Sequence, residues 1–293
     1  MNASTHSPIR LAYISGGFPV WALFVAQTQG VFQAHGVQVD ITHTGASTAQ
    51  MQGLRDGLFD IGLQLPDHVV RAGLHGTDLC VLAAQSHAPE VALVAAPDIQ
   101  EMAQLKGHRI AVDGARSGYA LLLVKLLTSL GWGPNDYELV EVGDSQQRVQ
   151  ALRRGELKAS FVNPPLDKAL VNDGFVRLTT TRQAFPNYPG PVVAARRAWA
   201  DAHVQAAQGF QNAWRAAWQW LLQPDHQAQA IEIAIKHLGA EAPAAQNALQ
   251  NLQRQGTPSI TAEGMAQVVD LVWHTEAVGA APKPDPAQYF WHA

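Results

Sequence analysis

The sequence predicts an α/β protein built from two similar Rossmann-like lobes, followed by a helical C-terminal segment. The first observation is a repeat: Leu-Arg-Asp-Gly-Leu-Phe-Asp-Ile at residues 54–61 returns in outline as Leu-Arg-Arg-Gly-Glu-Leu-Lys-Ala at residues 152–159. Around each copy, a strand, a polar turn, a helix, a glycine and an apolar strand follow in the same order. Two such lobes would enclose one cleft, lined by strand carboxyl ends and helix amino ends.

Composition narrows the class of protein. The chain has 293 residues, 47% hydrophobic and 15% charged, which is enough for two globular domains. A net charge of −4 without a Lys/Arg run argues against nucleic acid or an anionic membrane as a partner. Cys80 is the single cysteine, so an internal disulfide is excluded, and its apolar neighbours predict an inert thiol in a buried strand.

No targeting or membrane-spanning segment is evident. Residues 1–8 contain neither a basic nor an apolar run, so no secretory signal is visible. The most apolar stretches, such as residues 119–130, are shorter than the about 20 residues that cross a bilayer. We expect a chain that does not span the membrane, cytoplasmic if it is complete as written and periplasmic if a signal peptide has been removed.

Lobe one is expected to begin with residues 1–96 and to hold a largely parallel sheet. Its strands alternate in polarity or are continuously apolar, as buried strands are, at residues 9–15, 37–42, 59–65, 79–84 and 91–95. The intervening turns are rich in Gly and Ser, and helices follow at residues 20–30 and from Ser47 or Thr48 to Asp56. Gly57 then ends the second helix.

The pattern restarts after Pro97, so residues 97–191 are expected to form lobe two, inserted in lobe one. Strands are predicted at residues 109–113, 138–142, 158–162 and 175–178, and helices at residues 119–130, 146–154 and 167–172. Residues 192–293 are expected to return to lobe one. There Phe210, Trp214, Trp218 and Leu222 recur every four residues, a stripe that predicts helix packing on the core rather than a cofactor contact.

Several groups that could carry chemistry follow predicted strands. Asp67-His68 with Arg71, and Ser86-His87, could be acid-base clusters, or could simply form hydrogen bonds and helix caps. The turn Gly114–Gly118 could hold an anion on its backbone N–H groups, with Arg116 adding charge, or could be a plain turn. Aromatic residues beside Gly or Pro turns could stack on a flat ligand: Phe18, Trp21, Tyr119 and Tyr188. For Trp21, a core role is equally compatible.

No metal or cofactor is expected. The twelve His residues are scattered without metal-ligand spacing, and the chain has no Cys/His quartet. Phosphate-loop, dinucleotide-binding and nucleophile-elbow motifs are also absent from the sequence.

These features together resemble the type II periplasmic binding protein fold, in particular the sulfonate/nitrate/taurine-binding and thiamine-pyrimidine synthase-like group. The likeness covers nearly the whole chain and rests on four segments: residues 22–39, Leu54-x-x-Gly57-x-x-Asp60, residues 105–112, and Leu152-x-x-Gly155 with Pro164-Pro165. One departure is that Lys158 stands in the second repeat where Asp60 stands in the first.

The resemblance implies a solute-binding protein that closes two lobes by a hinge motion on a small organic anion or a flat aromatic or heterocyclic ligand. It also implies an ABC-type importer, with its permease as partner. The implied ligand contacts lie in five loops, and the candidates are Gly17, Phe18, Trp21, Gly45, Ala46, Ser47, Leu65, Asp67, Arg116, Ser117, Gly118, Tyr119 and Asn163. In this role the protein has no catalytic residues.

Enzymes of the same fold provide the alternative. The Cys-rich segment of the pyrimidine synthases is absent, and Gly17-Phe18 stands where the aromatic sulfinate desulfinases carry a Cys. A cytosolic, cofactor-free lyase or decarboxylase acting on an aromatic acid remains open. Its candidate proton donors are His68, Arg71 and His87.

Overall fold

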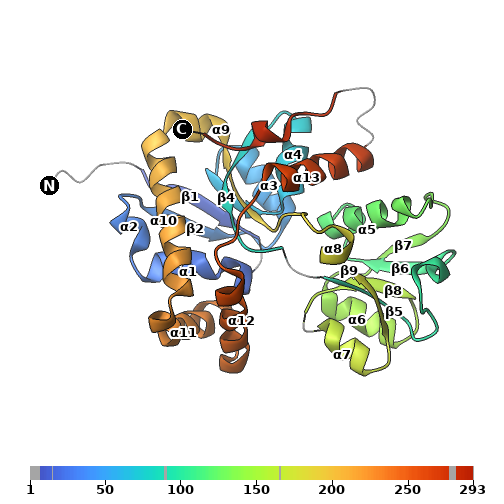
Figure 1. The fold of residues 1–293 in the computed structure, drawn as a ribbon. Helices are drawn as coiled ribbons and strands as arrows, with labels where there is room; N and C mark the ends of the chain where they lie inside the picture. Colours follow the sequence, from blue (N-terminus) through green and yellow to red (C-terminus); the bar gives the residue numbers. More distant parts are fainter. Residues whose placement is uncertain (1–6, 15, 89–90, 165, 277–281, 293) are drawn as a thin grey trace. The chain divides into compact units, whose positions relative to one another are not determined.

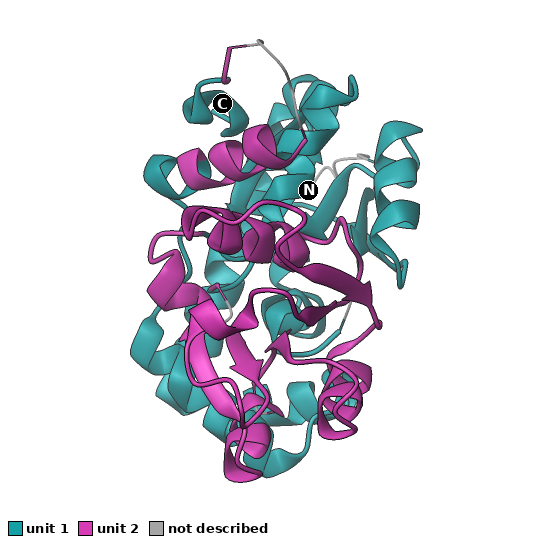
Figure 2. Ribbon diagram, turned by 90° about the vertical axis from the view of Figure 1, so that its right-hand side faces the viewer, with its two compact units in different colours: residues 1–87, 189–265, 284–293 teal, residues 88–188, 266–283 magenta. Residues whose placement is uncertain are grey.

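The computed structural model describes residues 7–14, 16–88, 91–164, 166–276 and 282–292. The chain divides into two compact units, drawn in different colours in Figure 2. Unit 1 comprises residues 1–87, 189–265 and 284–293, and unit 2 comprises residues 88–188 and 266–283. Among the described residues, none of the helices combines the length and apolar character needed to cross a membrane.

Unit 1 is built on a five-stranded sheet in the order β2-β1-β3-β10-β4. The strands are β1 Ile9–Tyr13, β2 Val39–His43, β3 Ile61–Gln64, β4 Leu79–Ala84 and β10 Val192–Arg196. The first three are parallel, whereas β10 runs antiparallel to both β3 and β4. The helices are α1 Trp21–Thr28, α2 Val31–Ala34, α3 Ser47–Arg55, α4 Pro66–Leu74, α9 Arg197–Ala202, α10 Val204–Leu222, α11 Gln227–Leu238 and α12 Ala242–Gln255.

Unit 2 repeats this topology, with a five-stranded sheet in the order β7-β6-β8-β5-β9 (Figure 1). The strands are β5 Ala92–Ala95, β6 Arg109–Val112, β7 Glu138–Glu141, β8 Ala159–Val162 and β9 Val176–Thr180. Its helices are α5 Gly118–Ser129, α6 Ser145–Arg153, α7 Leu166–Asn172 and α8 Thr181–Ala184, and the last helix, α13 Ala262–Thr275, contains the division between the units. The expectation of two similar α/β lobes is confirmed.

The repeated glycines end helices in both units, as predicted. Gly57 follows α3 with φ +74°, and Gly155 follows α6 with φ +71°. This left-handed conformation carries no steric cost for glycine and strains any residue with a Cβ. The sequence repeat is therefore visible because each copy needs the same helix stop before the same strand.

Two expectations about the organisation of the chain are wrong. The chain passes between the units at residues 87/88 and 188/189 rather than near 96 and 192, because β5 pairs with β8 and β9 of unit 2. In addition, residues 192–293 do not all return to unit 1, since residues 266–283 belong to unit 2. The strand β10 is also absent from the sequence-based prediction.

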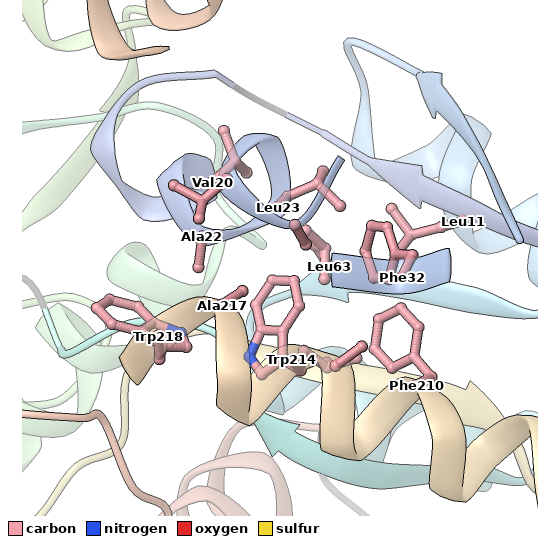
Figure 3. Packing of buried hydrophobic residues seen from close by; sticks show 14 of the residues in the cluster. Leu11, Val20, Ala22, Leu23, Phe32, Leu63, Phe210, Trp214, Ala217 and Trp218 are labelled. Atoms are coloured by element: carbon pink, nitrogen blue, oxygen red, sulfur yellow. The ribbon is translucent and has the colours of Figure 1, made fainter. Parts of the chain in front are cut away.

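The main core of unit 1 lies between one face of its sheet and the helices α1 and α10 (Figure 3). Phe210 stacks on Phe32 at 5.6 Å between ring centroids, and Trp214 donates from Nε1 to the Ala84 carbonyl at 2.9 Å. Phe210, Trp214 and Trp218 are all buried, while Leu222 is half-buried. The predicted aromatic stripe is thus confirmed as core.

Candidate functional site

In unit 1 the predicted ligand-contact turns follow strands that end at one edge of the sheet. β1 is parallel to β2 and β3, and the terminal residues Tyr13 and His43 are in register. The turns after the three strands contain the candidates Gly17, Phe18, Gly45, Ala46, Ser47, Leu65 and Asp67. The fold therefore brings these three turns to the same edge, where ligands bind in parallel α/β sheets.

A pair of rings at this edge was not anticipated from the sequence. Tyr13 and His43 stack with ring centroids 4.8 Å apart and an interplanar angle of 24°. The imidazole Nε2 of His43 lies 3.0 Å from the carbonyl oxygen of Ile14. Tyr13 is half-buried and His43 exposed, so the pair offers a flat surface for an aromatic ligand. Finding it requires the register of β1 and β2, which no local pattern encodes.

Trp21 is a core residue of unit 1. Its side chain is fully buried, and its indole Nε1 donates to the carbonyl oxygen of Ala230 at 3.0 Å. Phe18, half-buried in the preceding turn, packs on this indole with ring centroids 5.3 Å apart. The structure thus matches the core alternative for Trp21, whereas Phe18 keeps a partly exposed ring.

Asp67 lies in the first turn of α4 with no solvent exposure. One carboxylate oxygen is 3.5 Å from Nη1 of Arg71 and 4.0 Å from Nε2 of His68. Neither carboxylate oxygen has a hydrogen-bond partner among the described residues, and the same holds for Nδ1 of His68. The predicted Asp67-His68-Arg71 group is therefore brought together in space, with the buried carboxylate beside the side chains of Arg71 and His68.

His68 and Arg71 also line a pocket of about 340 Å³ within unit 1, between α3 and α4. The helix α3 contributes Ser47, Thr48, Met51, Gln52 and Arg55, and α4 with the residue after it contributes His68, Arg71, Ala72 and His75. One end of this pocket thus adjoins the predicted contact turn Gly45–Ser47. Sequence analysis identified Ser47, His68 and Arg71 but missed Arg55 and His75, because the pairing of α3 with α4 is a tertiary feature.

Two buried amides mark the same edge of the sheet. Gln64 ends β3, and both polar atoms of its side chain lack a hydrogen-bond partner within the described part of the chain. Gln85 follows β4 and donates from Nε2 to the Pro19 carbonyl oxygen at 3.2 Å. In the sequence, Gln64 stands in an otherwise apolar strand and Gln85 directly follows one. A buried amide without a partner is costly, so glutamines at such positions are a signal of a functional site.

His87, a candidate proton donor, takes part in a structural contact. Its Nε2 lies 2.8 Å from the carbonyl oxygen of Gly256, and its ring meets the edge of Trp218 at 6.3 Å. Ser86 donates its hydroxyl to the carbonyl oxygen of His87 at 3.3 Å. His87 therefore contacts the residue that follows α12 within unit 1, which matches the hydrogen-bonding alternative for Ser86 and His87.

In unit 2 some of the groups in the turn after β6 already have partners within the protein. The N–H of Ala115 donates to the Glu141 carboxylate at 2.7 Å, and the Ser117 hydroxyl caps α5 by accepting from the N–H of Ala120 at 3.1 Å. Arg116 is largely exposed and pairs with Glu276 at 2.5 Å. The Glu276 carboxylate thus pairs with Arg116, and the Glu141 carboxylate accepts from one N–H group of the turn. Both are groups that the hypothesis of an anion site in this turn assigns to a ligand.

The remaining candidates of unit 2 lie on its surface or the border of its core. Tyr119 and Tyr188 are half-buried against the main core of unit 2, and the Tyr188 ring is 6.5 Å from that of Phe185. Gly118 is buried as the first residue of α5. Asn163 is exposed and donates from Nδ2 to the hydroxyl of Ser145 at 3.1 Å.

Comparison with known protein families decides where this chain belongs. The model of the NMT1-like family matches residues 3–235, which is most of the sequence and includes parts of both units. The chain belongs to the NMT1-like family. The comparison with curated proteins gives no match for this NMT1-like protein.

Solved structures resemble this NMT1-like protein along its whole length. A Bordetella bronchiseptica RB50 protein gives a TM-score of 0.76 at 23% identity, covering 98% of this chain and 95% of the other. The periplasmic aliphatic sulphonate binding protein SsuA from Escherichia coli gives 0.76 at 21% identity and covers 98% of each chain. The periplasmic nitrate-binding protein NrtA from Synechocystis PCC 6803 gives 0.71 at 15% identity, with 98% and 85% covered. At these identities the likeness shows the fold.

The side chains able to bind a metal or to act as a nucleophile can be located in this NMT1-like protein. Within the described ranges, no group of three or more His, Cys, Asp or Glu side chains is placed to hold a metal ion. The thiol of Cys80 is buried in β4 and lies 3.7 Å from the carbonyl oxygen of Ala195. Burial raises the pKa of this thiol to about 12, so it is not a nucleophile in the folded protein.

Proposed function

We propose that this protein is the solute-binding component of an ABC-type importer and takes a small organic anion or a flat heterocycle. The observation that carries the proposal is that the chain belongs to the NMT1-like family and has the fold of binding proteins for sulfonate and nitrate. In each unit the candidate residues follow the carboxyl ends of parallel strands. That placement supports ligand binding through the turns of both units.

The lyase or decarboxylase alternative receives less support. His87 lies against the Gly256 carbonyl and Trp218, and His68 lies above the buried carboxylate of Asp67. Both arrangements serve packing and electrostatics without a further group. We therefore retain the binding protein as the proposed function.

Calorimetry on the purified full-length chain tests the proposal, with alkanesulfonates, nitrate, aromatic carboxylates and aminopyrimidines as ligands. Binding of one class with a dissociation constant in the micromolar range or below is the expected result. Mass spectrometry of ligand released from the denatured protein would identify a solute retained during purification. If no class binds and no ligand is released, the proposal fails.

Substitutions in each unit then locate the ligand. Ser47→Ala in unit 1 and Asn163→Ala in unit 2 should each raise the dissociation constant about tenfold, the effect of losing one ligand hydrogen bond of about 1.4 kcal/mol. Ser129→Ala is the matched control, because this exposed hydroxyl bonds only to the Leu126 carbonyl of its own helix among the described contacts. Equal affinities in all three variants would remove these turns from the site.

In this role the protein works in the periplasm, where solutes reach an importer, with the ABC permease as its partner. Cell fractionation of the native host gene product tests the location. A purely cytoplasmic product would contradict the importer role even if the ligand binds.

A further inference from the structure

We propose that the pocket between α3 and α4 of unit 1 is a binding site for a small oxyanion, meaning a sulfate, sulfonate, phosphate or carboxylate group. The pocket has a volume of about 340 Å³ and lies wholly within unit 1. Its volume is in the range of small-molecule sites. The walls carry the hydroxyl groups of Ser47 and Thr48 at one end. Farther along, two arginines and two histidines alternate with Met51, Gln52 and Ala72.

The charge of these walls is the first argument. Arg55 projects from α3 and Arg71 from α4, and His68 and His75 lie on the α4 side of the same pocket. The acidic groups nearby are the buried Asp67, which pairs with Arg71, and Asp56, whose carboxylate accepts from Nε2 of Gln52 at 2.9 Å. Two guanidinium groups therefore converge on one cavity in a chain whose net charge is −4, and guanidinium is the side-chain group best shaped for oxyanions.

The amino end of α3 is the second argument. Its N-cap position is Ala46, and no side chain among the described residues caps the helix. At the corresponding position of the repeat, 98 residues later (46 + 98 = 144), Asp144 caps α6 and accepts from the N–H of Gln147 at 2.9 Å. Unit 2 thus supplies its own carboxylate at this position, whereas in unit 1 a bound anion beside Ser47 and Thr48 would take the place of that carboxylate.

Buried Asp67 explains how the cationic wall is held in position. Its fully buried carboxylate lies 3.5 Å from Nη1 of Arg71, so the Arg71 guanidinium is held at the pocket wall by an ion pair before any ligand enters. An anion then meets charges that are already oriented, which lowers the entropy cost of binding. Ser47 belongs both to this pocket and to the proposed solute site, whereas Arg55 and His75 belong to the pocket alone, so substitutions of Arg55 and His75 distinguish the two proposals.

The experiment is a titration of the full-length, ¹⁵N-labelled protein with sodium sulfate, with sodium chloride at matched ionic strength as reference. Amide shifts in residues 47–55 and 66–75 should change and saturate with sulfate but not with chloride. Methanesulfonate and acetate, titrated separately, distinguish a free inorganic ion from an anionic group on a carbon chain. Saturable binding of any of the three at these residues supports the site, and binding of none overturns it.

Variants tie the binding to the pocket. The double substitution Arg55→Gln with His75→Gln replaces two exposed side chains that line the pocket. It should raise the dissociation constant for sulfate about tenfold. Arg153→Gln is the matched control, because Arg153 holds the place of Arg55 in α6 (55 + 98 = 153) and pairs with Asp173 at 2.6 Å. Unchanged affinity in the double variant, or an equal loss in the control, would refute the assignment.

Thr48→Glu provides a second variant that does not weaken the fold. Thr48 is exposed in the first turn of α3, where a carboxylate is favourable to the helix. The introduced charge should abolish sulfate binding while the thermal midpoint stays at or above that of the wild type. Sulfate binding at wild-type strength in this variant would contradict the site, whatever the outcome of the solute experiments.

Discussion

Gln50 in unit 1 and Arg148 in unit 2 make the same hydrogen bond from the same position of the repeat. Nε2 of Gln50 donates to the Leu63 carbonyl oxygen at 3.1 Å, and Nη2 of Arg148 donates to the Phe161 carbonyl oxygen at 3.2 Å. Donors and acceptors are both 98 residues apart (148 − 50 and 161 − 63). An equivalent bond, made with different side chains, thus ties α3 and α6 to their sheets, and Gln50 donates in addition to the Ala12 carbonyl oxygen at 2.9 Å.

This equivalence predicts that Gln is a better substitute for Arg148 than an apolar residue. Arg148 is buried and also donates to the Gly143 carbonyl, to Ser145 Oγ at 3.0 Å and to Ser160 Oγ at 3.1 Å. Arg148→Leu leaves several buried acceptors without a donor and should lower the free energy of unfolding by about 3 kcal/mol. Arg148→Gln should lower it by roughly half as much, since an amide can reach Phe161. Urea denaturation followed by circular dichroism measures both, and equal losses would contradict the equivalence.

Asp60 should make the stability of unit 1 dependent on acid pH. Desolvation alone would raise the pKa of Asp60, but hydrogen bonds from Arg10 at 2.6 Å and Arg196 at 2.9 Å outweigh it and hold the pKa below its usual 3.8. A lowered folded-state pKa gives stability that is present above the unfolded pKa and is lost as the pH falls through the folded value. Asp60→Asn should cost about 2 kcal/mol at pH 7 and flatten the pH profile below about 4, and thermal melts from pH 7 to pH 2 measure this. Identical pH profiles for variant and wild type would refute it.

Two helical glycines should respond to Ala in opposite directions. A Cβ at Gly73 in α4 has no heavy atom within 4 Å, so Gly73→Ala should stabilise the protein by roughly 0.5–1 kcal/mol. At Gly209 in α10, a Cβ would lie 2.9 Å from the His35 carbonyl oxygen and 2.8 Å from a Val37 methyl. Gly209→Ala should therefore destabilise by about 1–3 kcal/mol despite its better helix propensity. Shifts of thermal midpoint in the same direction would contradict one of the two assignments.

The thiol of Cys80 should report unfolding. Because its pKa is raised to about 12 and its side chain is buried in β4, reaction with Ellman's reagent at pH 8 should be slow in native protein and complete in denaturant. Across a urea series the labelling rate should follow the unfolded fraction of unit 1. Rapid labelling of the native protein would show that β4 opens locally.

The repeat, the helix stops and most strands could be predicted because they depend on local patterns of polarity and on glycine. The strand β10 was missed and β5 was assigned to the wrong lobe, since neither pairs with a strand next to it in the chain. β10 pairs with β3 and β4, more than a hundred residues earlier, and β5 leaves β4 to join β8 and β9. Which sheet a short apolar strand joins is decided by distant partners.

The same limit applied to the candidate site. Sequence placed Ser47, Asp67, His68 and Arg71 after strand ends, where local order is enough. It could not show that Trp21 would be bonded to Ala230, or that Arg116 would pair with Glu276, 160 residues away. Burial and charge neutralisation of this kind arise only when segments far apart in the chain pack together.

The departure of the second repeat at Lys158 has a consequence for folding. Lys158 pairs with Asp98 at 2.6 Å. At the equivalent position of the first repeat, Asp60 pairs with Arg10 and Arg196. The acidic and basic partners of the ion pair are therefore exchanged between the units. If β3 and β8 exchanged sheets while the chain collapses, Asp60 would face Asp98 and Lys158 would face two arginines. Like charges would oppose each exchange, so the reversed ion pairs favour the native partner of each strand over its counterpart in the other repeat.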